Sequence, residues 1–147
     1  MNIDRADFYY GSFLFNLLIK HKTIENLELL ETPYSHQYFT YKTPHSNSKN
    51  LVFMKYLPDS QSINTTWNFS LTEREHSTLS ELLITNQYEN TYIIFICGAN
   101  TLQDSHIFVL KNQEIQYLLN HKRAKIILQD SSLKCVIDNK ILSNTSL

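Results

Sequence analysis

The sequence predicts an α+β fold: a single compact domain, residues 1–147, in which an N-terminal helix and a central helix pack on a largely antiparallel sheet. Three observations favour this class. The chain has 147 residues, the length of one domain. Hydrophobic residues make up 42% of it, so it can bury a core without a metal or a disulfide. Segments with helical periodicity are interspersed among short runs rich in aromatic and β-branched residues.

The N-terminal helix is expected over residues 4–22. Its apolar face would be formed by Phe8, Leu14, Phe15, Leu17 and Leu18. Asp7 near the start and Lys20 near the end suit the helix dipole. Gly11 inside the helix costs about 1 kcal/mol relative to Ala, which predicts a packing reason for it. Tyr9 and Tyr10 are expected at the surface.

Two further helices are expected. Thr72 and Glu75 have the spacing of a capping box, in which a hydroxyl and a carboxylate satisfy two amides at a helix start. The apolar residues of this central helix are Leu79, Leu82 and Leu83. Asn112 would begin a shorter helix, whose inward residues are Ile115, Leu118 and Leu119.

The expected strands are short and rich in aromatic or β-branched residues. They cover residues 23–31, 38–41, 51–56, 67–70, 92–98, 107–110, 125–128 and 134–137. The segment 92–98 is apolar on both faces, as in a central buried strand. Pro44 marks a hairpin loop before the third strand, and residues 130–132 form the turn of a closing hairpin.

Composition excludes several classes of function. Lys and Arg number 13 and Asp and Glu 14, so the net charge of −1 excludes a strongly basic nucleic-acid binder. With two glycines there is no Walker loop and no dinucleotide-binding fingerprint. The two cysteines and six histidines lack the spacing of a zinc site, and a Gly-x-Ser-x-Gly motif is missing. We therefore predict no cofactor, no metal and no catalytic residue.

The protein is expected to be cytoplasmic and to bind no membrane. Charges among the first seven residues argue against a signal peptide, and the longest apolar stretch, residues 13–19, is too short to span a membrane. Cys97 and Cys135 lie in apolar runs and are expected to be buried, reduced thiols. A catalytic pair of Cys97 and His106 is a less favoured alternative, because nothing nearby would lower the pKa of the thiol.

The order of helix, three strands, helix and strand resembles that of the restriction-endonuclease-like nucleases. The resemblance implies an Asp on one central strand and a Glu-x-Lys on the next, where carboxylates hold magnesium and the Lys stabilises the transition state. Lys55 has the position of that Lys, but Phe53 stands where an acid is required. Asp59, Glu28 and Glu31 are the acids left to replace it. An active nuclease is therefore an alternative, not the leading interpretation.

A set of basic and aromatic residues is the candidate binding site. It comprises Lys42, His45, Lys49, Lys55, Tyr56 and Trp67. Cations interleaved with tyrosines are typical of surfaces that bind single-stranded nucleic acid, while tyrosine is also enriched at protein interfaces. Four cations over about fourteen positions are a weak basis for binding by counterion release. A protein partner is therefore expected, and nucleic acid is the alternative.

Several short motifs resemble, in the same order, those of a group of small uncharacterised bacterial proteins. They are residues 8–14 (FYYGSFL), 53–56 (FMKY), 67–70 (WNFS), 94–98 (IFICG) and 106–119. The chain departs from the group just before Trp67, where residues 64–66 (NTT) replace a basic residue and a proline. The resemblance implies one α+β domain of bacterial or phage origin, with no assigned activity.

Together these inferences predict a non-enzymatic binding protein. It would be an accessory or inhibitory factor of a bacterium, a phage or a mobile element, acting through a protein–protein interface. The alternative is a restriction-endonuclease-like, metal-dependent nuclease or a degenerate, nucleic-acid-binding relative of one.

Overall fold

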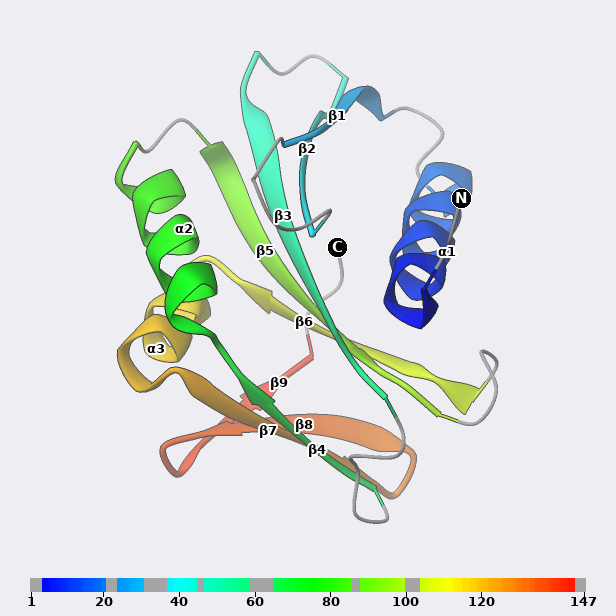
Figure 1. Cartoon of the computed structure of the whole chain (residues 1–147), viewed down its shortest axis with the longest axis vertical. Helices are drawn as coiled ribbons and strands as arrows, with labels where there is room; N and C mark the ends of the chain where they lie inside the picture. The colour runs from blue at the N-terminus through cyan, green and yellow to red at the C-terminus, as the bar shows by residue number, and fades with distance from the viewer. Residues whose placement is uncertain are drawn as a thin grey trace.

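Two strands that run parallel lie at the centre of a five-stranded sheet (Figure 1). The computed structural model of the chain describes residues 4–20, 24–30, 37–44, 47–58, 65–85, 88–99 and 104–144. In the order of the sheet, the strands are β1 (Glu25–Leu29), β2 (Tyr38–Lys42), β3 (Lys49–Leu57), β5 (Tyr88–Cys97) and β6 (His106–Lys111). β3 and β5 are parallel, and the other neighbours are antiparallel.

A second sheet of four antiparallel strands packs against one face of the first. Its strands, in order, are β4 (Thr66–Ser70), β7 (Arg123–Gln129), β8 (Ser132–Ile137) and β9 (Lys140–Ser143). The predicted α+β class with largely antiparallel pairing is confirmed. The sequence did not indicate the division into two sheets, the strand β9 or the parallel pair.

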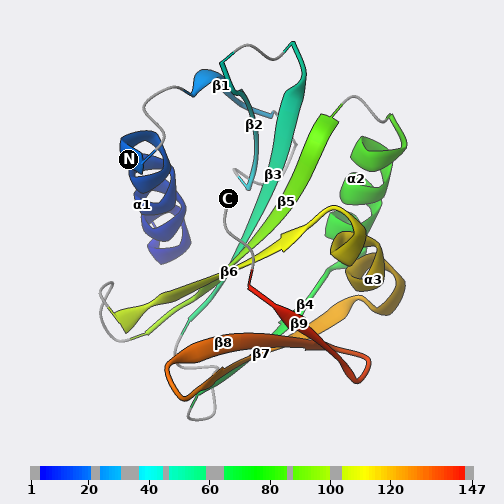
Figure 2. The same ribbon diagram turned by 180° about the vertical axis from the view of Figure 1, so that it is seen from behind.

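Helices cover both faces of the five-stranded sheet (Figures 1 and 2). They are α1 (Arg5–Lys20), α2 (Glu73–Ile84) and α3 (Gln113–His121). α1 lies on one face, and α2, α3 and the second sheet lie on the other. The predicted capping box is present: the Thr72 hydroxyl accepts a hydrogen bond from the Glu75 amide, and the Glu75 carboxylate accepts one from the Thr72 amide.

The larger core lies between the two sheets. β3 and β5 contribute Phe53, Ile93 and Phe95, which are fully buried. The Phe69 ring of β4 packs on that of Phe95, with centroids 4.4 Å apart. Inward residues of α2, α3, β6, β7 and β8 complete this core, including Leu79, Leu110, Ile115, Leu118, Ile126 and Ile137. The short strand at Trp67 therefore belongs to the second sheet and closes the core from the opposite side.

α1 packs with only part of the predicted face: Leu14 and Leu17 point towards the sheet, whereas Phe8, Phe15 and Leu18 do not. Tyr9 and Leu17 are buried against the sheet, with Tyr10, Phe13 and Leu14 partly buried beside them. The outward side carries Phe8, Phe15, Leu18 and Ile19, with exposed fractions of 53%, 64%, 41% and 53%. From residue 8 to residue 19 the helix contains no charged residue, so apolar periodicity does not distinguish its two sides.

Gly98, directly after β5, is required by a close approach of other elements. Its amide donates to the Leu57 carbonyl (2.8 Å), and its carbonyl accepts from the Trp67 indole Nε1 (3.0 Å). A Cβ atom at this position would lie 2.7 Å from Cε2 of Tyr56 and 2.8 Å from the Leu57 carbonyl oxygen. The other glycine, Gly11, has nothing within 4 Å of such a Cβ, so the described residues do not supply the packing reason expected for it.

The two glycines predict opposite effects of substitution by alanine. We expect Gly98→Ala to lower the free energy of unfolding by about 1–3 kcal/mol, because backbone or Tyr56 must move to relieve the overlap. Gly11→Ala is expected to raise it by about 0.5–1 kcal/mol, because alanine has a higher helix propensity than glycine at an exposed position within a helix. Urea unfolding of both variants tests this, and two effects of the same sign would contradict the packing described at Gly98.

Candidate functional site

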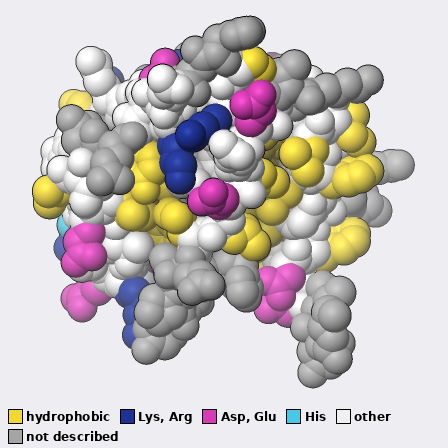
Figure 3. Space-filling model, turned by 90° about the horizontal axis from the view of Figure 1, so that it is seen from above, with side chains coloured by type: hydrophobic (Ala, Val, Ile, Leu, Met, Phe, Trp, Pro, Cys, Tyr) yellow, Lys and Arg dark blue, Asp and Glu magenta, His cyan; other side chains and the backbone are white. Residues whose placement is uncertain are grey.

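The predicted cations at the β2–β3 hairpin lie among acids. Lys42 and Lys49 are opposite each other in the sheet, and Glu25 is opposite Lys42 on β1. Lys49 forms an ion pair with Glu28 at 3.5 Å. Figure 3 shows Lys or Arg side chains beside Asp or Glu side chains at this end of the molecule. The surface is therefore mixed in charge. His45, the other residue predicted for this hairpin, lies outside the described residues.

Lys55 is separated from this hairpin. It follows Lys49 by six residues on β3, about 20 Å at the rise of a strand. Its ammonium group donates to the Glu75 carboxylate (2.5 Å) and to the Ser70 carbonyl (2.5 Å). The side chains of Lys55 and Glu75 are only 16% and 12% exposed. The structure thus divides the three described lysines between two places: Lys42 and Lys49 at the hairpin, and Lys55 beside α2.

Gln37 and Tyr10 extend the Lys55–Glu75 pair into a polar cluster. The Gln37 amide Nε2 lies 3.0 Å from the Met54 carbonyl, 3.3 Å from the Tyr10 hydroxyl and 3.4 Å from Oε2 of Glu75. The Tyr10 hydroxyl also accepts from the backbone amide of Tyr56 (3.2 Å). Burial is the main cause that raises the pKa of Tyr10, so its hydroxyl stays protonated. We call Tyr10, Gln37, Lys55 and Glu75 the Lys55 cluster.

The Lys55 cluster contains the Lys that the nuclease resemblance singled out, and it lies at the junction of β3 and α2. Its groups are already committed to one another: Oε1 of Glu75 accepts from Lys55 and the Thr72 amide, and Oε2 faces Gln37. Phe53, at the position of the expected acid, is fully buried in the core. Among the described residues no group of three or more His, Cys, Asp or Glu side chains is placed to hold a metal ion. Glu31 and Asp59 lie outside them.

Tyr56 and Trp67 pack against the rest of the fold. The Tyr56 ring stacks on that of Tyr9 with centroids 4.5 Å apart and planes 19° apart. Trp67 is 3% exposed, and its indole N–H is bonded to Gly98. Both rings help to join α1, β3, β4 and the end of β5, and Trp67 presents no surface to a partner.

Both thiols are free and buried. Cys97 is directly opposite His106 in the β5–β6 pair, so the two residues of the alternative catalytic pair are neighbours in the sheet. Burial, and to a smaller extent the nearby Cys135, raises the pKa of Cys97. Burial also raises the pKa of Cys135 to about 12. A thiol held protonated within the core is a poor nucleophile, so the geometry disfavours a cysteine enzyme.

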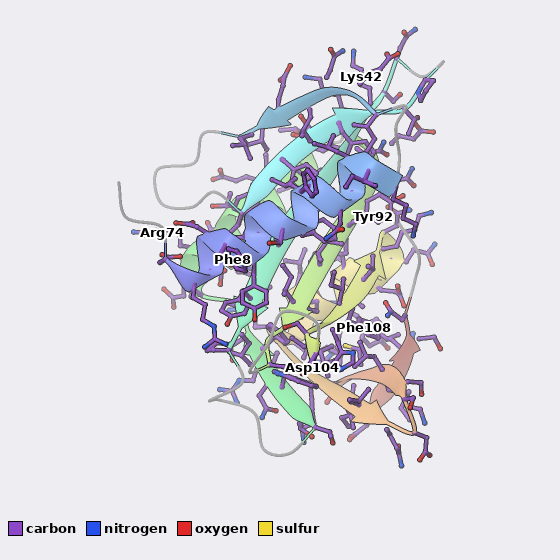
Figure 4. The ribbon with its side chains drawn as sticks, turned by 90° about the vertical axis from the view of Figure 1, so that its right-hand side faces the viewer. Phe8, Lys42, Arg74, Tyr92, Asp104 and Phe108 are labelled. Atoms are coloured by element: carbon purple, nitrogen blue, oxygen red, sulfur yellow. The ribbon has the colours of Figure 1, made fainter. Side chains whose placement is uncertain are left out.

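The exposed feature that sequence analysis missed is the outward side of α1. Four large apolar side chains lie there, from Phe8 in its first turn to Ile19 in its last. Figure 3 shows hydrophobic side chains gathered on the side of the molecule where α1 lies in Figure 1. In Figure 4, which faces this side, α1 crosses in front of the sheet with Phe8 near its start. The signal in the sequence was the uncharged run over residues 8–19.

Comparison of the chain with protein-family models, with curated proteins and with solved structures found no match. In the described part of the chain, no helix has the length and apolar character needed to cross a membrane.

The Lys55–Glu75 pair is predicted to be structural. Removing one partner, in Lys55→Met or Glu75→Gln, leaves the other group buried and is expected to cost about 3 kcal/mol. The double variant Lys55→Met/Glu75→Gln should be less destabilised than the sum of the single variants. A urea-unfolding double-mutant cycle measures the coupling, and additive effects would show that the two groups do not depend on each other.

The thiols are predicted to be inert in the folded protein. A thiol reagent at pH 8 should label neither cysteine until urea unfolds the chain, because burial keeps both protonated. The free energy of unfolding should fall as pH rises from about 9 towards 12, because the thiols ionise at lower pH in the unfolded chain than in the folded protein. Tyr41 acts in the same direction, because burial raises its pKa to about 12. Rapid labelling of native Cys97 would contradict its placement.

Proposed function

We propose that this protein is a non-enzymatic binding protein whose contact surface is the outward side of α1. The observation that carries the proposal is the exposure of Phe8, Phe15, Leu18 and Ile19 on one side of a helix whose other side is already packed on the sheet. Fully burying a side chain of this size contributes about 1.5–3 kcal/mol, so exposing four together is a cost that a partner would remove.

The composition of this surface suits an apolar protein partner. The centres of protein interfaces are depleted in charge, and α1 carries its charges only near its ends, at Arg5, Asp7 and Lys20. Gly11 lies between Phe8 and Phe15 along the outward side, and among the described residues none fills the space beside it. A side chain of the partner fits there without hindrance, which supplies the reason for glycine that the fold does not.

An accessory or inhibitory factor of a bacterium, a phage or a mobile element would act in this way, since it needs a partner and no reaction of its own. Two buried, unpaired thiols agree with a reducing, cytoplasmic location. The alternative, a nuclease or its nucleic-acid-binding relative, is favoured by the position of Lys55 beside Glu75 at the end of β3. The hydrogen bonds that both groups already make weigh against it.

The test is capture of partners by tagged protein from nuclease-treated lysate of its own source. The variant Phe15→Asp/Ile19→Asp should lose at least nine-tenths of a specific protein partner, because charge in the centre of an apolar interface is strongly unfavourable. Its free energy of unfolding should change by less than about 0.5 kcal/mol, since both side chains are exposed.

The matched control is Ile84→Asp/Ile141→Asp. Both isoleucines are exposed, at 81% and 65%, but Ile84 ends α2 and Ile141 lies in β9. The control should retain the partner. If both variants retain the partner equally, the proposal is contradicted. It is also contradicted if a parallel capture from untreated lysate recovers nucleic acid and no protein partner.

A further inference from the structure

β6 has an edge that no other strand pairs within the described part of the chain. It is the last strand of the five-stranded sheet and bonds to β5 on one side. On the other side, the backbone of Ile107 and Val109 forms hydrogen bonds with Asn144. Figure 2 shows the end of β9, which Asn144 follows, beside β6. An edge of this kind is a template for a further strand.

The side chain of Asn144, the residue after β9, occupies that edge. Its Oδ1 accepts a hydrogen bond from the Val109 amide (2.8 Å), and its Nδ2 donates to the Ile107 carbonyl (3.0 Å). In a parallel ladder, a carbonyl and an amide two residues apart bond the N–H and C=O of one residue on the next strand. The carboxamide of Asn144 therefore takes the place of one residue of a strand parallel to β6.

A groove of about 670 Å³ continues beside this contact. It is lined by the start of β6 (Ser105, His106, Ile107), by the β7–β8 turn and β8 (Ser131, Ser132, Leu133, Lys134), and by Ser143 and Asn144. The lining combines hydroxyl groups with two apolar side chains, Ile107, which is 39% exposed, and Leu133, and with the cation Lys134. It is suited to an extended backbone whose side chains are small and polar, with an acid near Lys134.

The opposite edge of the sheet lacks these features. β1 contains a bulge between Glu25 and Glu28, and Asn26 within it has a φ of 50°. Bulges and charged side chains are the usual means by which an edge strand avoids pairing. The edge at β6 instead combines regular backbone with an adjoining groove.

We propose that the β6 edge binds an extended peptide segment as an added parallel strand, and that the Asn144 carboxamide holds this position in the free protein. Binding displaces Asn144 from Ile107 and Val109, and the peptide backbone takes over both hydrogen bonds. Lys134 receives an acidic side chain of the peptide. This surface is separate from the outward side of α1, and peptide binding at β6 does not depend on the function proposed for α1.

The probe is the acetylated and amidated heptapeptide Thr-Val-Thr-Glu-Thr-Val-Thr, titrated into ¹⁵N-labelled full-length protein. Amide signals of residues 106–109 and 132–134 should shift. A spin label at the peptide N-terminus should broaden the start of β6 more than its end, because the added strand is parallel. The same peptide N-methylated at alternate residues should not bind, since it lacks the donors.

Three variants sharpen the test. Asn144→Ala removes the competing carboxamide and should tighten binding about tenfold, whereas Asn144→Asp, which keeps the acceptor for Val109, should tighten it less. Lys134→Glu leaves the contacts of Asn144 intact and should weaken binding about two- to fivefold, and a peptide with Lys in place of Glu should restore it. Phe15→Asp/Ile19→Asp should bind the peptide as the wild type does, which separates this proposal from the function of α1.

Binding of the N-methylated peptide with equal affinity would overturn the proposal, as would an affinity unaffected by Asn144→Ala or broadening at the far end of β6. If Asn144→Ala dimerises without peptide, as measured by light scattering, the occupant is a second copy of the chain and the peptide proposal is likewise overturned.

Discussion

The parallel pairing of β3 with β5 is the constraint on which the rest of the structure depends. Parallel neighbours need a long crossover, and here the connection contains both β4 and α2. The two strands are buried over most of their length on both faces, so the fold requires a cover on each side. α1 supplies one cover, and the second sheet with α2 and α3 supplies the other. The crossover also carries Glu75 to Lys55, so one connection builds the core and closes the polar cluster.

Local patterns predicted much of this fold. The capping box at Thr72, the apolar run of β5 and the turn before β8 each depend on neighbours in the chain, and each is present. The face that α1 buries was predicted only in part: Leu14 and Leu17 are inward, but Phe8, Phe15 and Leu18 are exposed, because large apolar and aromatic side chains extend around most of this uncharged helix. The choice is made by contacts from distant segments: Tyr10 bonds to the amide of Tyr56, and Tyr9 stacks on the Tyr56 ring. No periodicity within α1 contains that information.

The candidate site shows the same limit. The place of Lys55 on β3 followed from the order of the elements. Its partner Glu75 lies 20 residues further along the chain, where the capping box alone accounted for an acid. Gln37 joins the cluster from the residue before β2, where no motif marks it. The basic set from Lys42 to Lys55 was a match of spacing alone, and extended strand geometry places its two ends far apart. Contacts between elements, rather than residue types, decide which cations are available to a ligand.

We propose that this scaffold binds and does not cleave, because Lys55 and Glu75 hold each other within the fold. The most direct test incubates the purified protein with Mg²⁺ or Mn²⁺ and labelled single- and double-stranded DNA and RNA, beside Lys55→Met prepared in the same way. We expect no cleavage by the wild type above the level of the variant. Cleavage that requires the metal ion and is lost in a folded Lys55→Met protein would contradict it.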